Sequence, residues 1–266
     1  MLNEILHVIK IIRPHHLMKA IYSPFHTFRA LKYHYRRVPE QTFVRFLSEP
    51  LGCPPMTIEE AYDDLKKHKQ LWDDIRKDLS AYPENYGCQM TRELPCLYLL
   101  TRLIKPNQVV ETGVSSGASS AYILQALKDN KNGKLYSIDL PPDNLPQGKK
   151  SGWLVPEELR DIWDLRIGDT KQMLGPLLKK IGVIDFFVHD SLHTYDHMMW
   201  EYKRIWPYLR QGGLFLSHDV GANDAFLNFM KEVDIRWYDY RVFHVLGGFR
   251  KPSKNEINVD EIRSMK

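Results

Sequence analysis

One segment, residues 109–124, constrains the fold of this chain more than any other part of the sequence. Two valines lead into Glu111, and Gly113 and Gly117 then enclose a turn of small residues before a helix-compatible stretch. Because glycine lacks a Cβ and tolerates positive φ, such a turn lets the backbone approach a ligand closely. The N-terminus of the following helix directs unpaired N–H groups and a partial positive charge at that ligand. The segment therefore predicts a strand, a tight turn and a helix that cradle a nucleotide-like ligand.

Strand-like and helix-like runs alternate from about residue 107 onward. The predicted strands span residues 108–112, 134–139, 164–167, 183–189 and 213–218, and the predicted helices lie near 117–129, 156–161, 170–180, 194–210 and after 222. Two β-rich runs around a turn within residues 236–251 predict a closing hairpin. This alternation predicts an α/β fold with a Rossmann-like, doubly wound, mostly parallel seven-stranded sheet and a C-terminal antiparallel hairpin.

The first part of the chain differs from this pattern. Residues 1–90 contain helix-compatible stretches between prolines, and a capping-box sequence from Thr57 to Glu60 predicts a helix that runs to about Lys77. We therefore predict a helical, basic N-terminal extension over residues 1–90, followed by the ligand-binding domain over residues 91–266.

Positive charge is concentrated at the N-terminus. Residues 1–45 hold eight Lys or Arg and two acidic residues, whereas the remaining residues hold 29 Lys or Arg and 31 acidic residues. Apolar residues recur there at helical spacing, at Leu2, Ile5, Leu6, Ile9 and Ile12. Such an arm could contact an anionic membrane surface, an acidic partner or a second copy of the chain, or it could pack on its own core. The sequence leaves these alternatives open.

Composition excludes several classes of protein. With 43% apolar and 26% charged residues, the chain is typical of a globular protein, and its apolar runs fall short of the roughly 20 residues that span a bilayer. The N-terminus shows no secretory signal, so we expect a cytoplasmic protein. The three cysteines include no Cys-x-x-Cys pair and predict free thiols. Nucleic acid is not expected as a partner, because the region after the arm is nearly neutral.

Acidic residues stand at the ends of all five predicted parallel strands. They are Glu111, Asp139, Asp169, Asp190 and Asp219. Ligands of open parallel sheets bind beyond the carboxyl ends of the strands, so these acids are candidates for one site. Aspartate is also a preferred helix N-cap, and this alternative is open above all for Asp169 and Asp190.

Five short segments resemble the motifs of class I S-adenosylmethionine (SAM)-dependent methyltransferases, in particular the catechol O-methyltransferase-like branch that acts on small molecules. They are residues 111–119, 136–139, 168–170, 187–195 and 212–220, and the resemblance covers about residues 88–250. It implies a turn that wraps the methionine end of SAM, an acid that binds both ribose hydroxyls, and a segment at the adenine edge. The implied cofactor-binding residues are Glu111, Gly113, Ser115, Ser116, Gly117, Ser119, Asp139, Gly168, Asp169, Thr170 and Asp190.

The resemblance also implies a catalytic role for His193 and Asp190. In the metal-dependent members, oxygen ligands that match Asp190, His218 and Asp219 hold a divalent cation, which lowers the pKa of the acceptor hydroxyl. Imidazole suits zinc, iron or nickel better than magnesium, so both the presence and the identity of a metal stay open here. His193 falls where that branch has its lysine base, and it either accepts the proton or lines the cofactor pocket.

The sequence thus predicts a SAM-dependent methyltransferase that transfers a methyl group to a small-molecule acceptor, at a hydroxyl oxygen. The alternative is a non-catalytic SAM-fold module that docks on a membrane or partner through its basic arm. A NAD-dependent oxidoreductase is disfavoured, because Gly113-x-x-x-Gly117 is not the Gly-x-Gly-x-x-Gly turn that binds a pyrophosphate. Residues 140–156 form a long loop, whose Trp153 either covers a ligand or anchors the loop.

Overall fold

A single seven-stranded sheet organises the computed structural model, which describes residues 37–48, 56–82, 93–141, 145–236 and 240–252. Its strands are β1 (Gln108–Thr112), β2 (Lys134–Asp139), β3 (Trp163–Ile167), β4 (Ile184–His189), β5 (Leu209–Ser217), β6 (Tyr240–Phe243) and β7 (Leu246–Arg250). They lie in the order β3-β2-β1-β4-β5-β7-β6, with the first five parallel and β7 antiparallel to both β5 and β6. The predicted doubly wound sheet with a C-terminal hairpin is confirmed.

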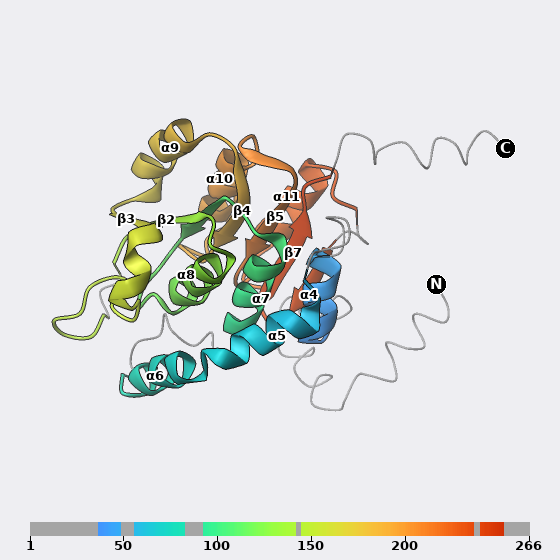
Figure 1. Ribbon diagram of the computed structural model, residues 1–266. Helices are drawn as coiled ribbons and strands as arrows, with labels where there is room; N and C mark the ends of the chain where they lie inside the picture. Colours follow the sequence, from blue (N-terminus) through green and yellow to red (C-terminus); the bar gives the residue numbers. More distant parts are fainter. Residues whose placement is uncertain (1–36, 49–55, 83–92, 142–144, 237–239, 253–266) are drawn as a thin grey trace, which may run out of the picture. The chain divides into compact units, whose positions relative to one another are not determined.

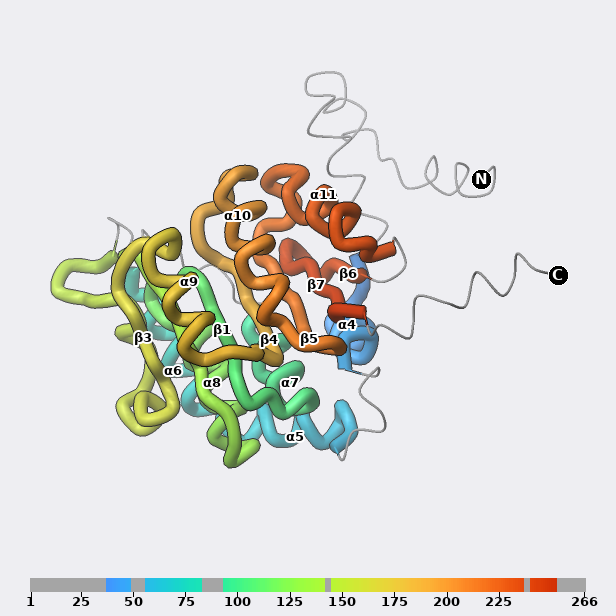
Figure 2. Tube along the Cα trace, turned by 90° about the horizontal axis from the view of Figure 1, so that it is seen from above, coloured from blue at the N-terminus to red at the C-terminus, as the bar shows by residue number. Residues whose placement is uncertain are grey.

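Helices cover both faces of the sheet (Figures 1 and 2). One side holds α7 (Leu94–Ile104) and α8 (Ala118–Asn130), with α4 (Glu40–Ser48), α5 (Ile58–Lys67) and α6 (Lys69–Ser80) packed alongside, and the other holds α9 (Thr170–Ile181), α10 (Tyr195–Ile205) and α11 (Ala225–Glu232). A short 3₁₀ helix, η3 (Glu157–Ile162), precedes β3. Strand order reverses between β1 and β4, and ligands of such sheets bind beyond the strand ends at this point.

The central strands of the sheet carry apolar side chains on both faces, so helices can cover them on both sides. Phe186 and Val188 face one helical layer and Phe187 the other, as expected for strands buried on both sides. Phe187 and Phe215 meet edge to face across β4 and β5, and Phe249 of β7 stacks on Phe215 at 4.8 Å between ring centroids. This packing holds the carboxyl ends of the central strands in fixed register.

Three predicted elements differ in detail. The capping box is confirmed, since Thr57 and Glu60 exchange both of its hydrogen bonds, but the helix that follows breaks at His68 into α5 and α6. The predicted helix at 156–161 is the 3₁₀ helix η3. The predicted helix at 194–210 ends at Ile205, because Pro207 cannot continue it, and β5 therefore begins at Leu209 instead of residue 213.

The sheet belongs to a compact unit that begins at Val38. The N–H group of Val38 donates to the carbonyl oxygen of Val242 on β6, so α4 starts beside the hairpin. Helices α4 to α6 therefore lie in the same unit as the sheet, whereas a domain boundary near residue 90 remains a prediction. The segment of the arm before Arg37 lies outside the described residues, and its contacts remain predictions as well.

Two further expectations concern thiols and membranes. Cys96 is a buried free thiol, as predicted, while Cys53 and Cys88 fall outside the described residues. None of the helices in the described part of the chain is long and apolar enough to cross a membrane.

Candidate functional site

The glycine turn lies directly against the end of β4. Gly113 adopts a φ of +87°, and a Cβ at this position would lie 2.0 Å from the carbonyl oxygen of Asp190. Gly117, also at +87°, precedes α8, and its Cβ would lie 2.7 Å from Gly152 Cα. Only glycine satisfies both the positive φ and the close backbone approach. The turn therefore packs closely against the end of β4 and against the loop that contains Gly152.

Asp139, at the end of β2, closes this turn. Its Oδ1 accepts hydrogen bonds from the backbone N–H groups of Val114 (2.9 Å) and Ser115 (3.3 Å), and its Oδ2 accepts one from the Ser151 hydroxyl. Asp139 is almost fully buried by these partners. The carboxylate predicted to bind ribose thus joins β2 to the turn and to the loop after β2.

Glu111, predicted to contact the cofactor, lies inside the junction of β1, β2 and α8. Its carboxylate accepts hydrogen bonds from the hydroxyls of Ser119, Ser120 and Ser137 at 2.6–2.7 Å. Complete burial raises the pKa of Glu111 to about 7, although the three hydroxyls act in the opposite direction. Glu111 and Ser119 therefore meet each other, and the charge of this buried acid is sensitive to pH near neutrality.

The segment after β3 forms a helix cap. The carboxylate of Asp169 accepts from the N–H of Lys171 at 2.8 Å, so the N-cap alternative holds for this acid. Gly168 donates its N–H to the carbonyl oxygen of Asp139, and Thr170 is buried beside His197. Gly168 is thus tied to the end of β2, whereas Asp169 caps α9 and Thr170 contacts α10.

Two apolar side chains beside Asp139 were missed by the sequence reasoning. Leu140 is 67% exposed and Ile167 is 51% exposed, and Ile167 pairs with Asp139 in the β2–β3 register. Large exposed apolar side chains at a strand end are suited to an apolar ligand surface. The position of Leu140, directly after a strand-ending acid, is the signal that could have identified it.

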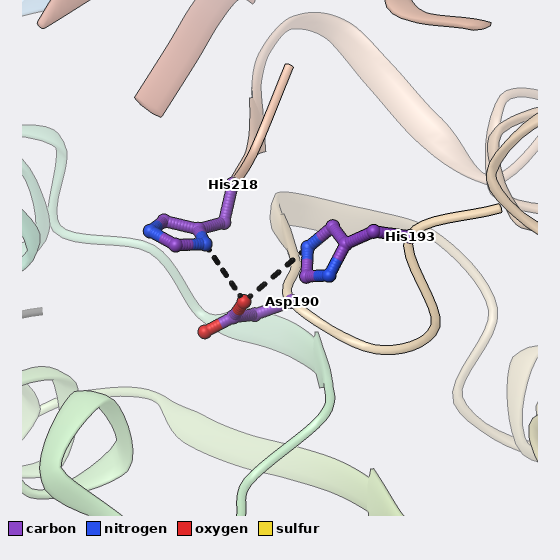
Figure 3. Close-up of side chains that lie close together, drawn as sticks. All are labelled: Asp190, His193 and His218. Carbon is purple, nitrogen blue, oxygen red and sulfur yellow. Dashed lines mark ion pairs between the residues drawn. The ribbon is translucent and has the colours of Figure 1, made fainter. Parts of the chain in front are cut away.

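Asp190, His193 and His218 converge at the ends of β4 and β5, and we call them the Asp–His cluster (Figure 3). The Oδ1 atom of Asp190 lies 3.1 Å from Nδ1 of His218 and 3.5 Å from Nε2 of His193. Asp219, whose φ is +48° and whose side chain is 44% exposed, lies farther away, with its Oδ2 at 3.7 Å from His218 Nδ1 and 3.9 Å from His193 Nδ1. The cluster is thus anchored on Asp190.

The two histidines of the cluster differ in their electrostatics. Burial disfavours the charged form of His218, but the adjacent carboxylates of Asp190 and Asp219 outweigh this effect and raise its pKa to about 9. Burial lowers the pKa of His193 despite the attraction of the same carboxylates. At neutral pH, His218 is therefore a cation paired with Asp190, and His193 is a neutral base.

The cluster also has the donor set of a cation site. One ligand atom from each of its three residues lies within 4.8 Å of the other two. Within the described residues, His193 Nε2 and His218 Nδ1 are buried without a well-aligned hydrogen bond. Two imidazoles and a carboxylate fit a divalent transition metal better than magnesium. The tightest geometric set therefore contains His193, whereas the ligand set predicted from sequence contained Asp219.

Part of the chain matches a known family of protein domains. A family model described as a methyltransferase domain matches residues 110–220, which include the glycine turn and the Asp–His cluster. This part of the chain is similar to methyltransferases. This confirms the prediction made from its motifs. No curated protein sequence matches the chain.

Solved methyltransferase structures share the fold at low sequence identity. The O-methyltransferase from Bacillus cereus, in complex with S-adenosylhomocysteine (SAH), is 12% identical with a TM-score of 0.53, covering 80% of this chain and 100% of that one. TomG, the O-methyltransferase from Streptomyces achromogenes in complex with SAM, is 15% identical with a TM-score of 0.52, and the match covers 68% of this chain and 89% of TomG. The SAH-bound methyltransferase PaMTH1 from Podospora anserina is 16% identical with a TM-score of 0.51, and the match covers 76% of this chain and 100% of PaMTH1. At these identities the likeness is one of fold.

The loop after β2 is tied to the glycine turn. The N–H groups of Gly152 and Leu154 donate to the carbonyl oxygens of Ser115 (2.8 Å) and Ser116 (2.9 Å). Trp153 between them is half-buried against the edge of Tyr82. In the described structure Trp153 therefore anchors the loop, and the loop covers part of the turn.

Proposed function

We propose that this protein is a methyltransferase that uses SAM to methylate a hydroxyl oxygen of a small-molecule acceptor. The observation that carries the proposal is the direct contact between the glycine turn and the Asp–His cluster. The backbone of Gly113 touches the carbonyl of Asp190, so a cofactor on the turn lies beside a neutral histidine base. Methyl transfer to a hydroxyl needs both an aligned acceptor and a proton acceptor.

The cofactor residues follow from the turn and the strand ends. The turn 113–117 would hold the methionine part of SAM, Asp139 its ribose, and the exposed side chains of Leu140 and Ile167 its adenine. When bound, SAM supplies the methyl group on a sulfonium, which is a good leaving group. The B. cereus and Streptomyces structures contain SAH and SAM, which supports this choice of cofactor.

The Asp–His cluster would handle the acceptor. His193 would take the hydroxyl proton, with Asp190 orienting the ring and stabilising the imidazolium that forms. If a divalent cation occupies the cluster, His193 serves as a ligand, and the ion would lower the pKa of the acceptor hydroxyl. Asp219, at the exposed edge, would bind a second polar group of the acceptor.

The acceptor would carry an apolar or aromatic body. Leu192, 58% exposed, and Tyr195, 41% exposed, flank His193 in the chain and are among the few large exposed apolar side chains of the described residues. Tyr195 accepts a hydrogen bond from Asn228 on α11, which fixes its ring at the start of α10. These side chains offer a surface for the part of the acceptor that does not react.

Calorimetry and methyl transfer test the proposal. We expect SAH to bind, NAD⁺ not to bind, and label from [methyl-³H]SAM to appear on some member of a panel of catechols, phenols and hydroxylated glycosides. Binding of SAH without transfer to any acceptor would favour the non-catalytic module. Binding of NAD⁺ in place of SAH would overturn the proposal.

A further inference from the structure

A buried carboxylate, Glu201 of α10, lies beneath the Asp–His cluster and plays no part in the proposed chemistry. Its Oε2 accepts hydrogen bonds from Thr112 Oγ1 (2.7 Å) and His189 Nδ1 (2.8 Å). Its Oε1 accepts from His197 Nε2 (2.8 Å) and Ser191 Oγ (3.0 Å). The side chain is fully buried, and none of these partners is Lys or Arg. Both oxygens are therefore committed to neighbours on several elements.

These partners lie at the ends of the two central strands. Thr112 is the last residue of β1, so the next residue opens the glycine turn. His189 is the last residue of β4, and Ser191 stands two positions later, so Glu201 binds the residues on both sides of Asp190. One carboxylate thus joins the glycine turn to the loop that carries Asp190 and His193.

Glu201 is ionised in this setting. Burial alone would raise its pKa, but hydrogen bonds from His189, His197 and Thr112, together with the electrostatic attraction of His189, lower the pKa far below its ordinary value. A buried carboxylate is costly unless its oxygens are satisfied, so any loss of these donors must rearrange the loop or the charge. The four partners are consequently held in one geometry.

A single residue, His189, connects Glu201 to the proposed base His193. With its Nδ1–H committed to Glu201, the ring of His189 is fixed in orientation, and it meets the ring of His193 edge to face at 5.4 Å between centroids. The carbonyl oxygen of His193 is held independently by the side-chain amide of Asn223 (3.0 Å). The position of His193 is therefore restricted at its ring by His189 and at its backbone by Asn223.

We propose that Glu201 is the positioning residue of this methyltransferase, which sets Asp190 and His193 against the glycine turn through His189, Ser191 and Thr112. The inference rests on the proposed function. Glu201 does not touch substrate or cofactor, so its removal should impair turnover more than cofactor binding.

The variant that tests this is Glu201→Gln. The two side chains have the same shape, but the amide nitrogen cannot accept the two hydrogen bonds that one carboxylate oxygen accepts. Tyr98→Phe is the matched control, because it removes a partly buried hydrogen bond to the carboxylate of Asp129 (2.5 Å) on the opposite helical layer. We expect kcat to fall about 10- to 100-fold in Glu201→Gln and to change less than about twofold in Tyr98→Phe. KM for SAM and Kd for SAH should stay within about threefold in both.

Crystals of the wild type and Glu201→Gln, each grown with SAH, provide a readout that needs no acceptor. We expect the variant to lose the 3.5 Å approach of Asp190 to His193 and the edge-to-face contact of His189 with His193. Unchanged ring positions, or a kcat equal to that of Tyr98→Phe, would overturn the inference. A wild type that neither binds SAH nor transfers methyl groups would instead contradict the proposed function, and the ring positions would still test the inference.

Discussion

At the scale of single residues, the site depends on two histidines that share one carboxylate and differ in charge. Asp190 stabilises the cation of His218, while burial keeps His193 neutral. A base must be unprotonated at the working pH, so only His193 is suited to accept a proton.

The first prediction concerns this base. We expect His193→Ala to lower kcat by a factor of about 10² to 10⁴, the usual contribution of a general base, while Kd for SAH changes less than about threefold. His68→Ala is the control, because His68 is similarly exposed and also pairs with an aspartate, Asp129, but lies on the opposite helical layer. Equal losses of turnover and of SAH affinity would assign His193 to cofactor binding.

The second prediction concerns pH and Glu111. Its pKa is about 7 in the folded protein against 4.5 for an ordinary glutamate, so between these values the folded state holds a proton that the unfolded state releases. Folding stability should therefore fall by on the order of 3 kcal/mol as the pH rises from 4.5 to 7. Urea unfolding at several pH values should show a smaller fall in Glu111→Gln. Parallel stability curves for both proteins would contradict this expectation.

The third prediction concerns a metal. We expect Co²⁺ to produce a visible d–d absorption spectrum with the wild-type protein and with Asp219→Asn, but not with His193→Ala, because the tightest ligand set contains His193. Magnesium at equal concentration should not displace the cobalt. Loss of the spectrum in Asp219→Asn alone would restore the ligand set expected from the sequence.

At the scale of elements, the β1–α8 unit with its glycine turn decides where the site forms. The backbone of the turn packs so closely on the end of β4 that no side chain fits at Gly113. The position of the turn is therefore fixed by the end of β4 and by Asp190, which follows it.

The fourth prediction compares two glycines with similar backbone angles. Gly113→Ala places a Cβ 2.0 Å from the Asp190 carbonyl oxygen, whereas Gly148→Ala, at a φ of +76°, places it in open space. Gly148→Ala should cost about 1 kcal/mol for its left-handed backbone. Gly113→Ala should cost more and should abolish SAH binding, as measured by urea unfolding and calorimetry. Similar effects of the two substitutions would show that the contact with Asp190 is unimportant.

At the scale of the whole molecule, the compact unit from Val38 to Lys266 contains every residue assigned to the site. For the basic arm before it, a membrane surface, an acidic partner, a second copy of the chain and the protein's own core all remain predicted binding surfaces.

The fifth prediction follows from this division. Replacement of residues 1–37 by a single methionine should leave cooperative unfolding and SAH affinity intact, within about threefold, because the compact unit is retained. Sedimentation with phosphatidylserine vesicles and size-exclusion chromatography of both forms would then assign the arm to a membrane or to self-association. Failure of the shortened chain to fold would show that the arm completes the core.

The sequence determined the secondary-structure elements of this protein and its likeness to methyltransferases. Local signals, such as the apolar strands, the glycine turn and the acids that follow the strands, are encoded by neighbouring residues and can be read in order along the chain. They located the glycine turn, Asp139 and the residues of the Asp–His cluster.

Only the tertiary structure decided how these residues divide their roles. Glu111 turned inward onto three serines, His193 joined Asp190 and His218, and Glu201 met Thr112, which lies 89 positions earlier in the chain. Such contacts depend on how α10 packs against the ends of β1 and β4, and no local periodicity encodes the distance between residues so far apart. Burial then sets the charge of each group, because the cost of ionisation depends on the neighbours that folding supplies.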